Sequence, residues 1–304
     1  MKKILLLPLV LAVSACVPAS HPGVVTRAAM EPASTSSLPA MKRFTVHQSL
    51  PAPRSNNDLS LDFIELSFRM ESGKELPVFT RFEGPVSVRV IGAPPPTLGP
   101  DLTALMNRLR QEARIDISPT TNPAANITVE AVSRRTISKV LPQAACFVAP
   151  NVSSLDEYKK VRRTAQTNWS LLKTRSRVSI FIPNDASPQE VRDCLHEELA
   201  QALGPLNDLY RLPDSVFNDD NVHTVLTGFD MTILRAYYDP ALRSGMTRGQ
   251  VANALPGIFA RINPGGTSTQ ARFVTRTPRE WNAAVQGALG PGRSSGQRQD
   301  AAYS

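Results

Sequence analysis

Hydrophobic residues recur with the periods of helices and strands between about residues 57 and 289. Leu59, Phe63, Leu66 and Met70 follow a helical spacing, and residues 82–91 alternate between apolar and polar positions as a strand does. Because strands interleave with helices along this stretch, the pattern predicts one α+β domain over residues 57–289. Further strands are predicted over 126–132 and 178–182, and further helices are predicted to begin at Asp101, Ser187, Thr227, Thr247 and Thr277.

The first sixteen residues have the layout of a secretion signal. Met1-Lys2-Lys3 is positively charged, residues 4–13 are apolar, and small residues lead to Cys16. Ten apolar residues are too few for a membrane-spanning helix, which needs about 20. Val13-Ser14-Ala15-Cys16 resembles the lipobox of bacterial lipoproteins, which implies removal of residues 1–15 and lipidation of Cys16. The alternative is a buried N-terminal helix of the core.

The segments outside the predicted domain are polar and rich in small residues. Residues 16–56 contain many Pro, Ser, Ala and Thr, which predicts a disordered tether between the lipid and the domain. Residues 290–304 predict a disordered tail. Because Val17 follows Cys16 in place of an inner-membrane retention aspartate, the resemblance implies the outer membrane. The predicted location is the bacterial cell envelope, lipid-anchored and facing the periplasm.

Positive charge exceeds negative charge, with 34 Lys and Arg against 26 Asp and Glu and a formal net charge of +8. In the cell envelope this surplus does not predict nucleic acid as a partner, but favours an anionic lipid or cell-wall polymer. A solvated basic face without a specific ligand is the simpler interpretation. The basic residues gather with two aromatic residues between positions 158 and 177: Tyr158, Lys159, Lys160, Arg162, Arg163, Trp169, Lys173, Arg175 and Arg177.

Three cysteines exclude a disulfide-dense scaffold and a zinc ribbon. With Cys16 assigned to lipid, Cys146 and Cys194 remain. In an oxidising periplasm these two most simply pair with each other, which closes a loop of about fifty residues and contributes roughly 3 to 4 kcal/mol to stability. Two unpaired buried thiols are the alternative.

The segment 191–204 carries the main candidate for chemistry. At about 100° per residue, Glu198 falls on the same face as Val191, Cys194, Leu195 and Leu199. A carboxylate among apolar neighbours has a raised pKa unless a cation or donor compensates, which is typical of a functional acid or base. A structural carboxylate that accepts hydrogen bonds from a neighbouring loop is the alternative.

The residues around Glu198 resemble the metzincin zinc-protease motif H-E-x-x-H-x-x-G-x-x-H. Glu198 stands at the catalytic glutamate and Gly204 at the glycine, but the three ligand positions hold Glu197, Gln201 and Asn207. Zinc favours imidazole and thiolate ligands and is rarely held by amide oxygens, so no zinc site and no cofactor are expected. A hard cation such as calcium remains possible on the oxygen donors of Glu197, Glu198, Gln201, Asn207, Asp208, Asp219 and Asp220.

Residues from about 58 to 264 also resemble a bacterial family known only as domain of unknown function 2927. This resemblance implies a zincin-like fold, in which a small mixed sheet packs on helices and the C-terminal part is helical, and it assigns no activity. The segments that carry it are Phe79–Pro85, Ala145–Pro150, Arg192–Gly204, Ser215–Asn221 and Gly245–Thr247.

Two functional hypotheses follow from these residues. The first is a non-catalytic envelope lipoprotein whose domain binds a peptide, a cell-wall component or a partner protein in the cleft formed by Glu197, Glu198, Gln201, Asn207, Asp208 and Asp219. The second is a hydrolase in which Glu198 acts as general base, with an atypical metal or none. The first is preferred, because the ligand set for zinc is broken.

Overall fold

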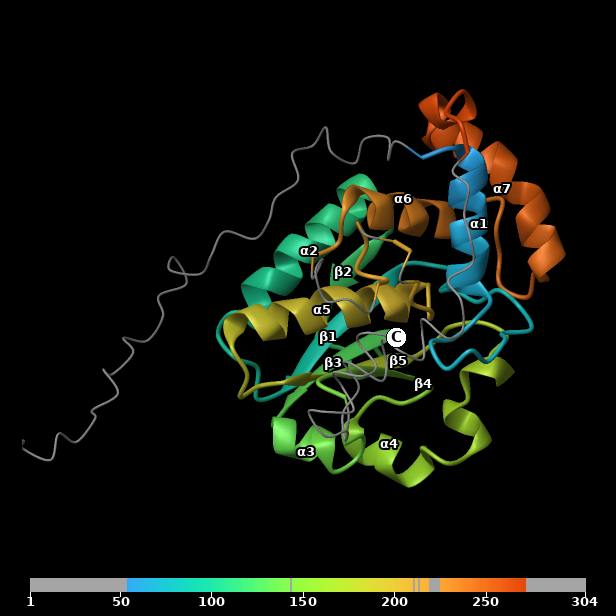
Figure 1. The fold of residues 1–304 in the computed structure, drawn as a ribbon. Coiled ribbons are helices and arrows are strands. Elements are labelled where there is room, and N and C mark those ends of the chain that lie inside the picture. The colour runs from blue at the N-terminus through green and yellow to red at the C-terminus, as the bar shows by residue number, and fades with distance from the viewer. Residues whose placement is uncertain (1–53, 143, 210, 213, 219–224, 272–304) are drawn as a thin grey trace, which may run out of the picture. The chain divides into compact units, whose positions relative to one another are not determined.

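The computed structural model describes residues 54–142, 144–209, 211–212, 214–218 and 225–271. Its sheet has five strands, which are β1 (Val86–Gly92), β2 (Ile117–Pro119), β3 (Ile127–Val132), β4 (Phe147–Pro150) and β5 (Val178–Pro183). Their order across the sheet is β2-β1-β3-β5-β4 (Figure 1). All neighbours pair in parallel except β4, which is antiparallel to β5. The sheet is therefore mixed, and β4 forms one of its edges.

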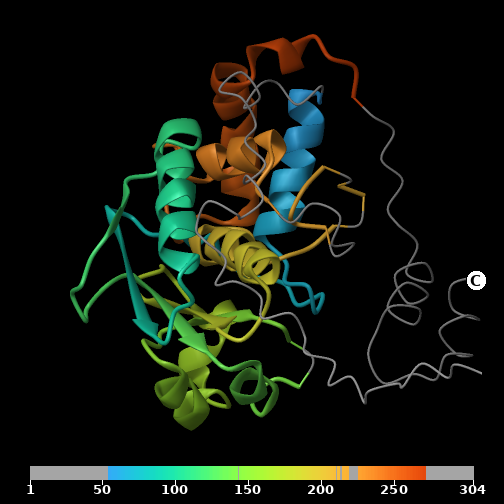
Figure 2. The ribbon, with the colours of Figure 1, turned by 90° about the vertical axis from the view of Figure 1, so that its left-hand side faces the viewer.

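Helices cover both faces of the sheet. The described residues contain α1 (Asn56–Ser67), α2 (Leu98–Glu112), α3 (Arg134–Ser138), α4 (Leu155–Val161), α5 (Pro188–Leu203), α6 (Gly228–Tyr237) and α7 (Arg248–Ile262). α2 and α5 lie on one face of the sheet, and α3 and α4 lie on the other (Figures 1 and 2). α1 packs against α7, and α6 contacts both α7 and α2.

The main hydrophobic core fills the space between the sheet and helices α2 and α5. Leu105, Ile180 and Leu199 are fully buried in it. Every residue of β5 is buried, as expected for a strand that has parallel pairing and helices on both faces. A smaller core that includes Phe147 and Phe181 lies under α3 and α4. α5 is therefore fixed by packing along its whole sheet-facing side.

The predicted α+β class is confirmed. Ser187, Thr227 and Thr247 each accept a hydrogen bond from a backbone N–H three residues later, so α5, α6 and α7 begin where the sequence predicts. The strands predicted over 126–132 and 178–182 correspond to β3 and β5.

Two predicted starts of elements were wrong, and α1 ends at Ser67, before Met70. Thr97 rather than Asp101 precedes α2, and Asp101 lies in the first turn, where its carboxylate pairs with Arg192 of α5 at 3.2 Å. β1 begins at Val86 rather than at residue 82, because Pro85 has no N–H to offer to a ladder. At α2, the carboxylate of Asp101 has a partner in a distant helix instead of capping its own helix. At β1, the missing N–H of Pro85 sets where the strand starts.

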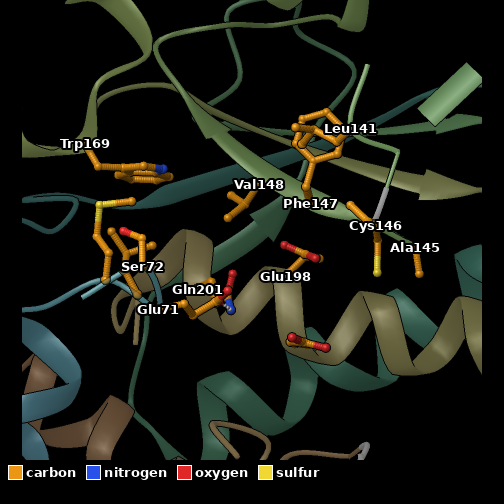
Figure 3. A pocket seen from close by; sticks show the side chains of 14 residues that line it. Glu71, Ser72, Leu141, Ala145, Cys146, Phe147, Val148, Trp169, Glu198 and Gln201 are labelled. Atoms are coloured by element: carbon orange, nitrogen blue, oxygen red, sulfur yellow. Dashed lines mark hydrogen bonds between the residues drawn. The ribbon is translucent and has the colours of Figure 1, made fainter. Parts of the chain in front are cut away.

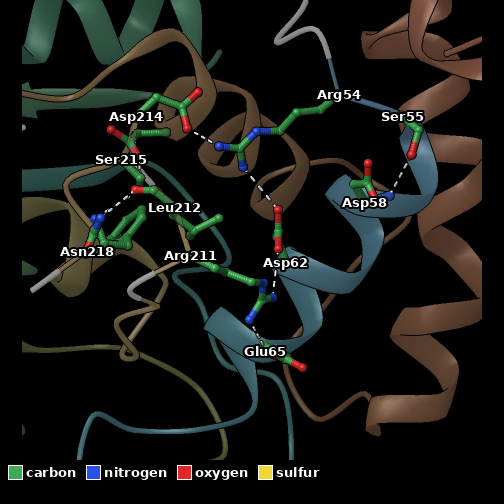
Figure 4. Close-up of polar contacts among 12 residues, drawn as sticks. Arg54, Ser55, Asp58, Asp62, Glu65, Arg211, Leu212, Asp214, Ser215 and Asn218 are labelled. Carbon is green, nitrogen blue, oxygen red and sulfur yellow. Dashed lines mark hydrogen bonds and ion pairs between the residues drawn. The ribbon is translucent and has the colours of Figure 1, made fainter. Parts of the chain in front are cut away.

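A network of charged side chains ties α1 to the segment that follows α5. Asp62 of α1 accepts hydrogen bonds from Arg54 at 3.1 Å and from Arg211 at 2.8 Å (Figure 4). Arg211 also donates to Glu65 at 2.7 Å, and Arg54 pairs with Asp214. Each carboxylate of this network therefore faces at least one guanidinium group.

Some predictions concern residues outside the described ranges. These are the signal peptide and Cys16, the tether up to residue 53, the helix from Thr277 and the tail. In the part of the chain that the structure describes, no helix is both long enough and apolar enough to cross a membrane.

Candidate functional site

A pocket of about 540 Å³ lies between α5 and the segment that leads into β4. Glu197, Glu198 and Gln201 of α5 line one side, and residues 144–148 line the facing side (Figure 3). Trp169 lies at one end of the pocket. Met70, Glu71, Ser72, Leu141 and Leu206 complete the lining. The pocket is thus bounded by a core helix on one side and an edge strand on the other.

The helix that carries Glu198 is held at both ends. Ser187 caps its first turn, and Pro188 occupies the first turn, where a missing N–H costs no helical hydrogen bond. At its C-terminus the buried Arg175 donates to the carbonyl oxygens of Gln201, at 2.5 Å, and of Ala202, at 2.8 Å. These bonds satisfy carbonyls that have no partner within the helix. The register of α5, and with it the place of Glu198, is therefore fixed from outside the helix.

Arg175 also connects the end of α5 to the pocket wall. Its guanidinium lies 5.1 Å from the centre of the Trp169 ring and makes a further hydrogen bond to Gly204. Burial lowers the pKa of Arg175 below its usual value, but guanidinium remains the charged form at neutral pH. This cation is engaged by backbone carbonyls and by an aromatic face.

Glu198 is 5% exposed and points into the pocket (Figure 3). Its Oε2 atom is buried and accepts no hydrogen bond from the described residues. Burial raises the pKa of Glu198 well above its usual value, and the carboxylates of Glu197, Glu71 and Asp208 raise it further. The alternative interpretation of Glu198, a structural carboxylate held by hydrogen bonds from a neighbouring loop, requires donors at this carboxyl group. No donor among the described residues bonds its Oε2 atom.

The other predicted site residues differ in where they lie. Glu197 and Gln201 line the pocket with Glu198, whereas Asn207 lies outside the lining and donates from Nδ2 to the Glu65 carbonyl at 3.0 Å. Asp208 acts on Glu198 through its charge. Asp219 and Asp220 lie outside the described residues. Of the predicted site residues, the structure thus brings together at the pocket the three that lie on α5, which are Glu197, Glu198 and Gln201.

Two parts of the pocket were missed by sequence reasoning. Glu71 accepts a hydrogen bond from Gln201 Nε2 at 2.9 Å, although 130 positions separate them in the chain. Val148 lies in β4, a strand of four residues that ends at Pro150 and carries no sustained alternation. Only the packing of the loop around Glu71 and the pairing of β4 with β5 reveal these positions.

The predicted disulfide between Cys146 and Cys194 is confirmed, with a distance of 5.9 Å between the two Cα atoms. Cys194 lies one helical turn before Glu198, and Cys146 lines the pocket directly before β4. The bond therefore ties the two walls of the pocket together across a sequence separation of 48 residues.

The side chain of Asp230 fixes the loop at residues 215–217. Its carboxylate accepts hydrogen bonds from the Ser215 hydroxyl at 2.6 Å and from the backbone N–H groups of Val216 and Thr227 at 3.2 and 2.7 Å. Burial nevertheless raises the pKa of Asp230 to about 6. Phe217 in the same loop is fully buried. This arrangement is structural.

The histidine next to the motif does not reach the pocket. His196 is fully buried, and its Nδ1 atom accepts a hydrogen bond from the Leu226 N–H at 3.3 Å. Burial, with the charges of Arg108 and Arg192, lowers the pKa of His196 to about 3, so the ring is neutral. Within the described ranges, no three His, Cys, Asp or Glu side chains are grouped so that they could hold a metal ion.

The basic stretch between 158 and 177 is divided by the fold. Arg162 donates to the Val140 carbonyl, Arg177 donates to the Asn151 carbonyl and pairs with Glu157, and Arg175 is buried under Trp169. The exposed residues that remain are Lys159, Lys160, Arg163 and Lys173. Lys159 also pairs with Asp156 at 3.0 Å, so four of the seven basic residues bind within the domain.

Comparison with known proteins identifies one family. The model of a protein family of unknown function, DUF2927, matches residues 56–257, which include every strand and α1 to α6. No curated protein and no solved structure matches the chain. Since the family model covers more than half of the sequence and includes the whole lining of the pocket, the chain belongs to the DUF2927 family.

Proposed function

We propose that this protein is a non-catalytic binding module of the bacterial cell envelope, in which the groove between β4 and α5 holds an extended polypeptide segment. The observation that carries the proposal is the edge position of β4 beside the pocket. An edge strand presents backbone donors and acceptors that can pair with an added strand. The resemblance of the α5 sequence to the metzincin motif supports the same use of the groove.

The pairing of β4 determines which of its backbone groups face outward. Asn151 donates its backbone N–H to the Arg177 carbonyl at 2.7 Å, so the residue that follows β4 bonds toward the β5 side. In an antiparallel pair the bonding direction alternates along the strand, which turns Ala149 and Phe147 toward β5 and Val148 away from it. The N–H and C=O groups of Val148 are therefore available to a bound strand, and Val148 itself lines the pocket.

The groove is also held in a fixed shape before any ligand arrives. The disulfide joins its two walls, and Arg175 fixes both the end of α5 and the Trp169 ring. A preformed groove loses less conformational entropy on binding than one that must be ordered by its ligand. This rigidity favours a binding role.

The test uses Val148→Pro, with Val148→Ala as the matched control. Proline at an edge position removes only the outward N–H, whereas alanine keeps it and removes the side chain. A displayed library of random nine-residue peptides is selected on the full-length protein, and the selected peptides are measured by calorimetry. We expect Val148→Pro to weaken binding at least tenfold and Val148→Ala less than threefold.

Thermal unfolding of both variants controls for damage to the sheet. N-methylation of single backbone nitrogens in the selected peptide repeats the test with the unchanged protein, and methylation at one position is expected to abolish binding. Equal affinity of the wild type, both variants and all methylated peptides would contradict strand addition.

The location in the envelope rests on the N-terminal sequence, which places Cys16 at the end of a lipoprotein signal. We expect Cys16→Ser to release the protein from outer-membrane fractions into the soluble fraction. An unchanged membrane association would remove the lipid anchor from the proposal.

A hydrolase that uses Glu198 as general base is the second candidate, and the raised pKa of this carboxyl favours it. Hydrolysis of a fluorogenic peptide library by the full-length protein, abolished by Glu198→Gln, would replace the binding role with this one.

A further inference from the structure

The ionisable side chains that line the pocket among the described residues are carboxyl groups, whose ionised form only accepts hydrogen bonds. Glu198 is nine-tenths buried and aimed into the pocket, and its Oε2 atom has no donor among the described residues. Gln201 directs one of its two Nε2 hydrogens to Glu71 Oε1 at 2.9 Å. No Lys, Arg or His lines the pocket in the described part of the chain. A ligand group that carries hydrogen-bond donors therefore complements the Oε2 atom of Glu198.

Among the described residues, the charged side chains that line the pocket are all acidic. Glu71 and Glu197 line it with Glu198, and Asp208 adds to their field at Glu198. The guanidinium of Arg175 is bound by backbone carbonyls at the end of α5 and faces the Trp169 ring. A positive charge in the pocket would gain from all of these carboxylates at once.

Apolar surface lies beside the acidic groups. Val148, Leu206, Met70 and the ring of Trp169 line the same pocket. Long cationic side chains pack an aliphatic stem on apolar surface and present a charged head, and an aromatic face attracts such a head.

We propose that the pocket binds an alkyl-guanidinium or alkyl-ammonium group, in which the charged head meets Glu198 and the stem packs against Val148 and Trp169. In the form that rests on the proposed function, this group is the side chain of an arginine or lysine in the bound peptide. The cation supplies hydrogen-bond donors for Glu198 and a positive charge, which no described residue of the lining carries.

The proposal predicts a link between binding and pH. Because Glu198 must be ionised to pair with a cation, binding below its pKa releases one proton to the solvent. Affinity for the cation then rises with pH, by up to tenfold for each pH unit, until Glu198 is ionised in the free protein. A neutral ligand of the same shape has no such dependence.

The test titrates the full-length protein with n-butylguanidinium and with the neutral n-butylurea, which has nearly the same shape, and follows binding by NMR. We expect n-butylguanidinium to bind at least tenfold more tightly than n-butylurea at pH 8, and its binding to release a proton at any pH at which Glu198 is protonated in the free protein. Glu198→Gln is expected to weaken it at least tenfold and to remove the pH dependence. The matched control Glu75→Gln removes one negative charge from an exposed side chain outside the lining and should change affinity less than twofold.

Further arms distinguish the sources of the cation. An acetylated Ala-Ala-Arg-Ala-Ala amide that binds more tightly than n-butylguanidinium, and loses this advantage in Val148→Pro, supports a peptide side chain. If n-butylguanidinium binds equally to the wild type and to Val148→Pro, and the peptide does not bind, the pocket proposal stands and the strand-addition proposal fails. Three results would overturn the proposal that the pocket binds an organic cation. These are equal affinities for n-butylurea and n-butylguanidinium, an unchanged affinity for n-butylguanidinium in Glu198→Gln, and displacement of n-butylguanidinium by micromolar calcium.

Discussion

Two buried carboxylates in this domain have opposite surroundings. Asp62 of α1 is 2% exposed and faces the guanidinium groups of Arg54 and Arg211 at 3.1 and 2.8 Å (Figure 4). In the pocket, Glu198 is 5% exposed, and the charges that act on it are those of three other carboxylates (Figure 3). The two carboxyl groups are similarly buried, but only the charge of Asp62 is balanced by neighbouring guanidinium groups.

This difference separates a structural group from one that is open to a ligand. A buried ion pair that the chain supplies itself is complete, and removing one member leaves the other buried and unpaired. A buried carboxyl without a cation takes a proton instead, and keeps its capacity to accept a cation from outside. Removing the charge of Asp62 should therefore lower the free energy of unfolding, whereas removing the charge of Glu198 should raise it.

The largest effect is expected from Asp62→Ala. This substitution leaves Arg54 and Arg211 without a shared carboxylate, and we expect a loss of about 3 to 5 kcal/mol in the free energy of unfolding. Urea denaturation at pH 7, followed by circular dichroism, measures it. The control is Glu75→Gln in the exposed pair with Arg69, which should change the stability by less than about 0.5 kcal/mol. A loss below about 1 kcal/mol for Asp62→Ala would mean that the network does not hold α1.

The pocket side of the comparison is held by a covalent bond instead of ion pairs. Replacing both Cys146 and Cys194 with serine is expected to lower the free energy of unfolding by about 3 to 4 kcal/mol, because the unfolded chain regains the freedom of a long loop. Hydrogen exchange should become faster in residues 144–148 and stay unchanged in α1. Wild-type protein under reducing conditions is the control, and an equal exchange rate in oxidised protein and double variant would show that the bond does not fix the pocket wall.

The sequence predicts the pocket side of the comparison better than the ion network. A helical period alone puts Glu198 on the apolar face of α5, and the number of cysteines suggests the bond between Cys146 and Cys194. The position of Glu198 follows from local spacing along the chain, and the disulfide follows from the number of cysteines. Asp62 and Arg211 are brought together by tertiary packing across 149 positions, and no local pattern marks such a pair.

The basic stretch shows the same limit in another form. Arg175 looks like one of several surface cations in the sequence, yet the fold buries it against the carbonyl groups at the end of α5. β4 was missed because four residues give too short a pattern, and its pairing depends on the distant β5. Burial and edge position are properties of packing, which local periodicity describes only where an element is long.

The smallest change is expected from Glu198→Gln, and its sign is opposite to that of Asp62→Ala. Burial and the neighbouring carboxylates raise the pKa of Glu198, so the folded protein binds this proton more tightly than the unfolded chain. The stability that the proton confers is present at low pH and is lost as the pH rises above the usual value of 4.5. Glutamine carries no charge at any pH, and we expect the variant to be more stable by on the order of 1 kcal/mol at pH 8.

The difference between the two stability curves isolates Glu198. Asp230 also has a raised pKa, about 6, and therefore lowers stability as the pH rises from 3.8. Because both proteins contain Asp230, its contribution cancels when the free energies of unfolding are subtracted at each pH. A difference that grows from pH 5 to pH 8 is expected, and saturating n-butylguanidinium should reduce it, since the bound cation stabilises the wild type alone. Parallel curves over this range would show that Glu198 titrates like an exposed carboxyl, and the contrast with Asp62 would then fail.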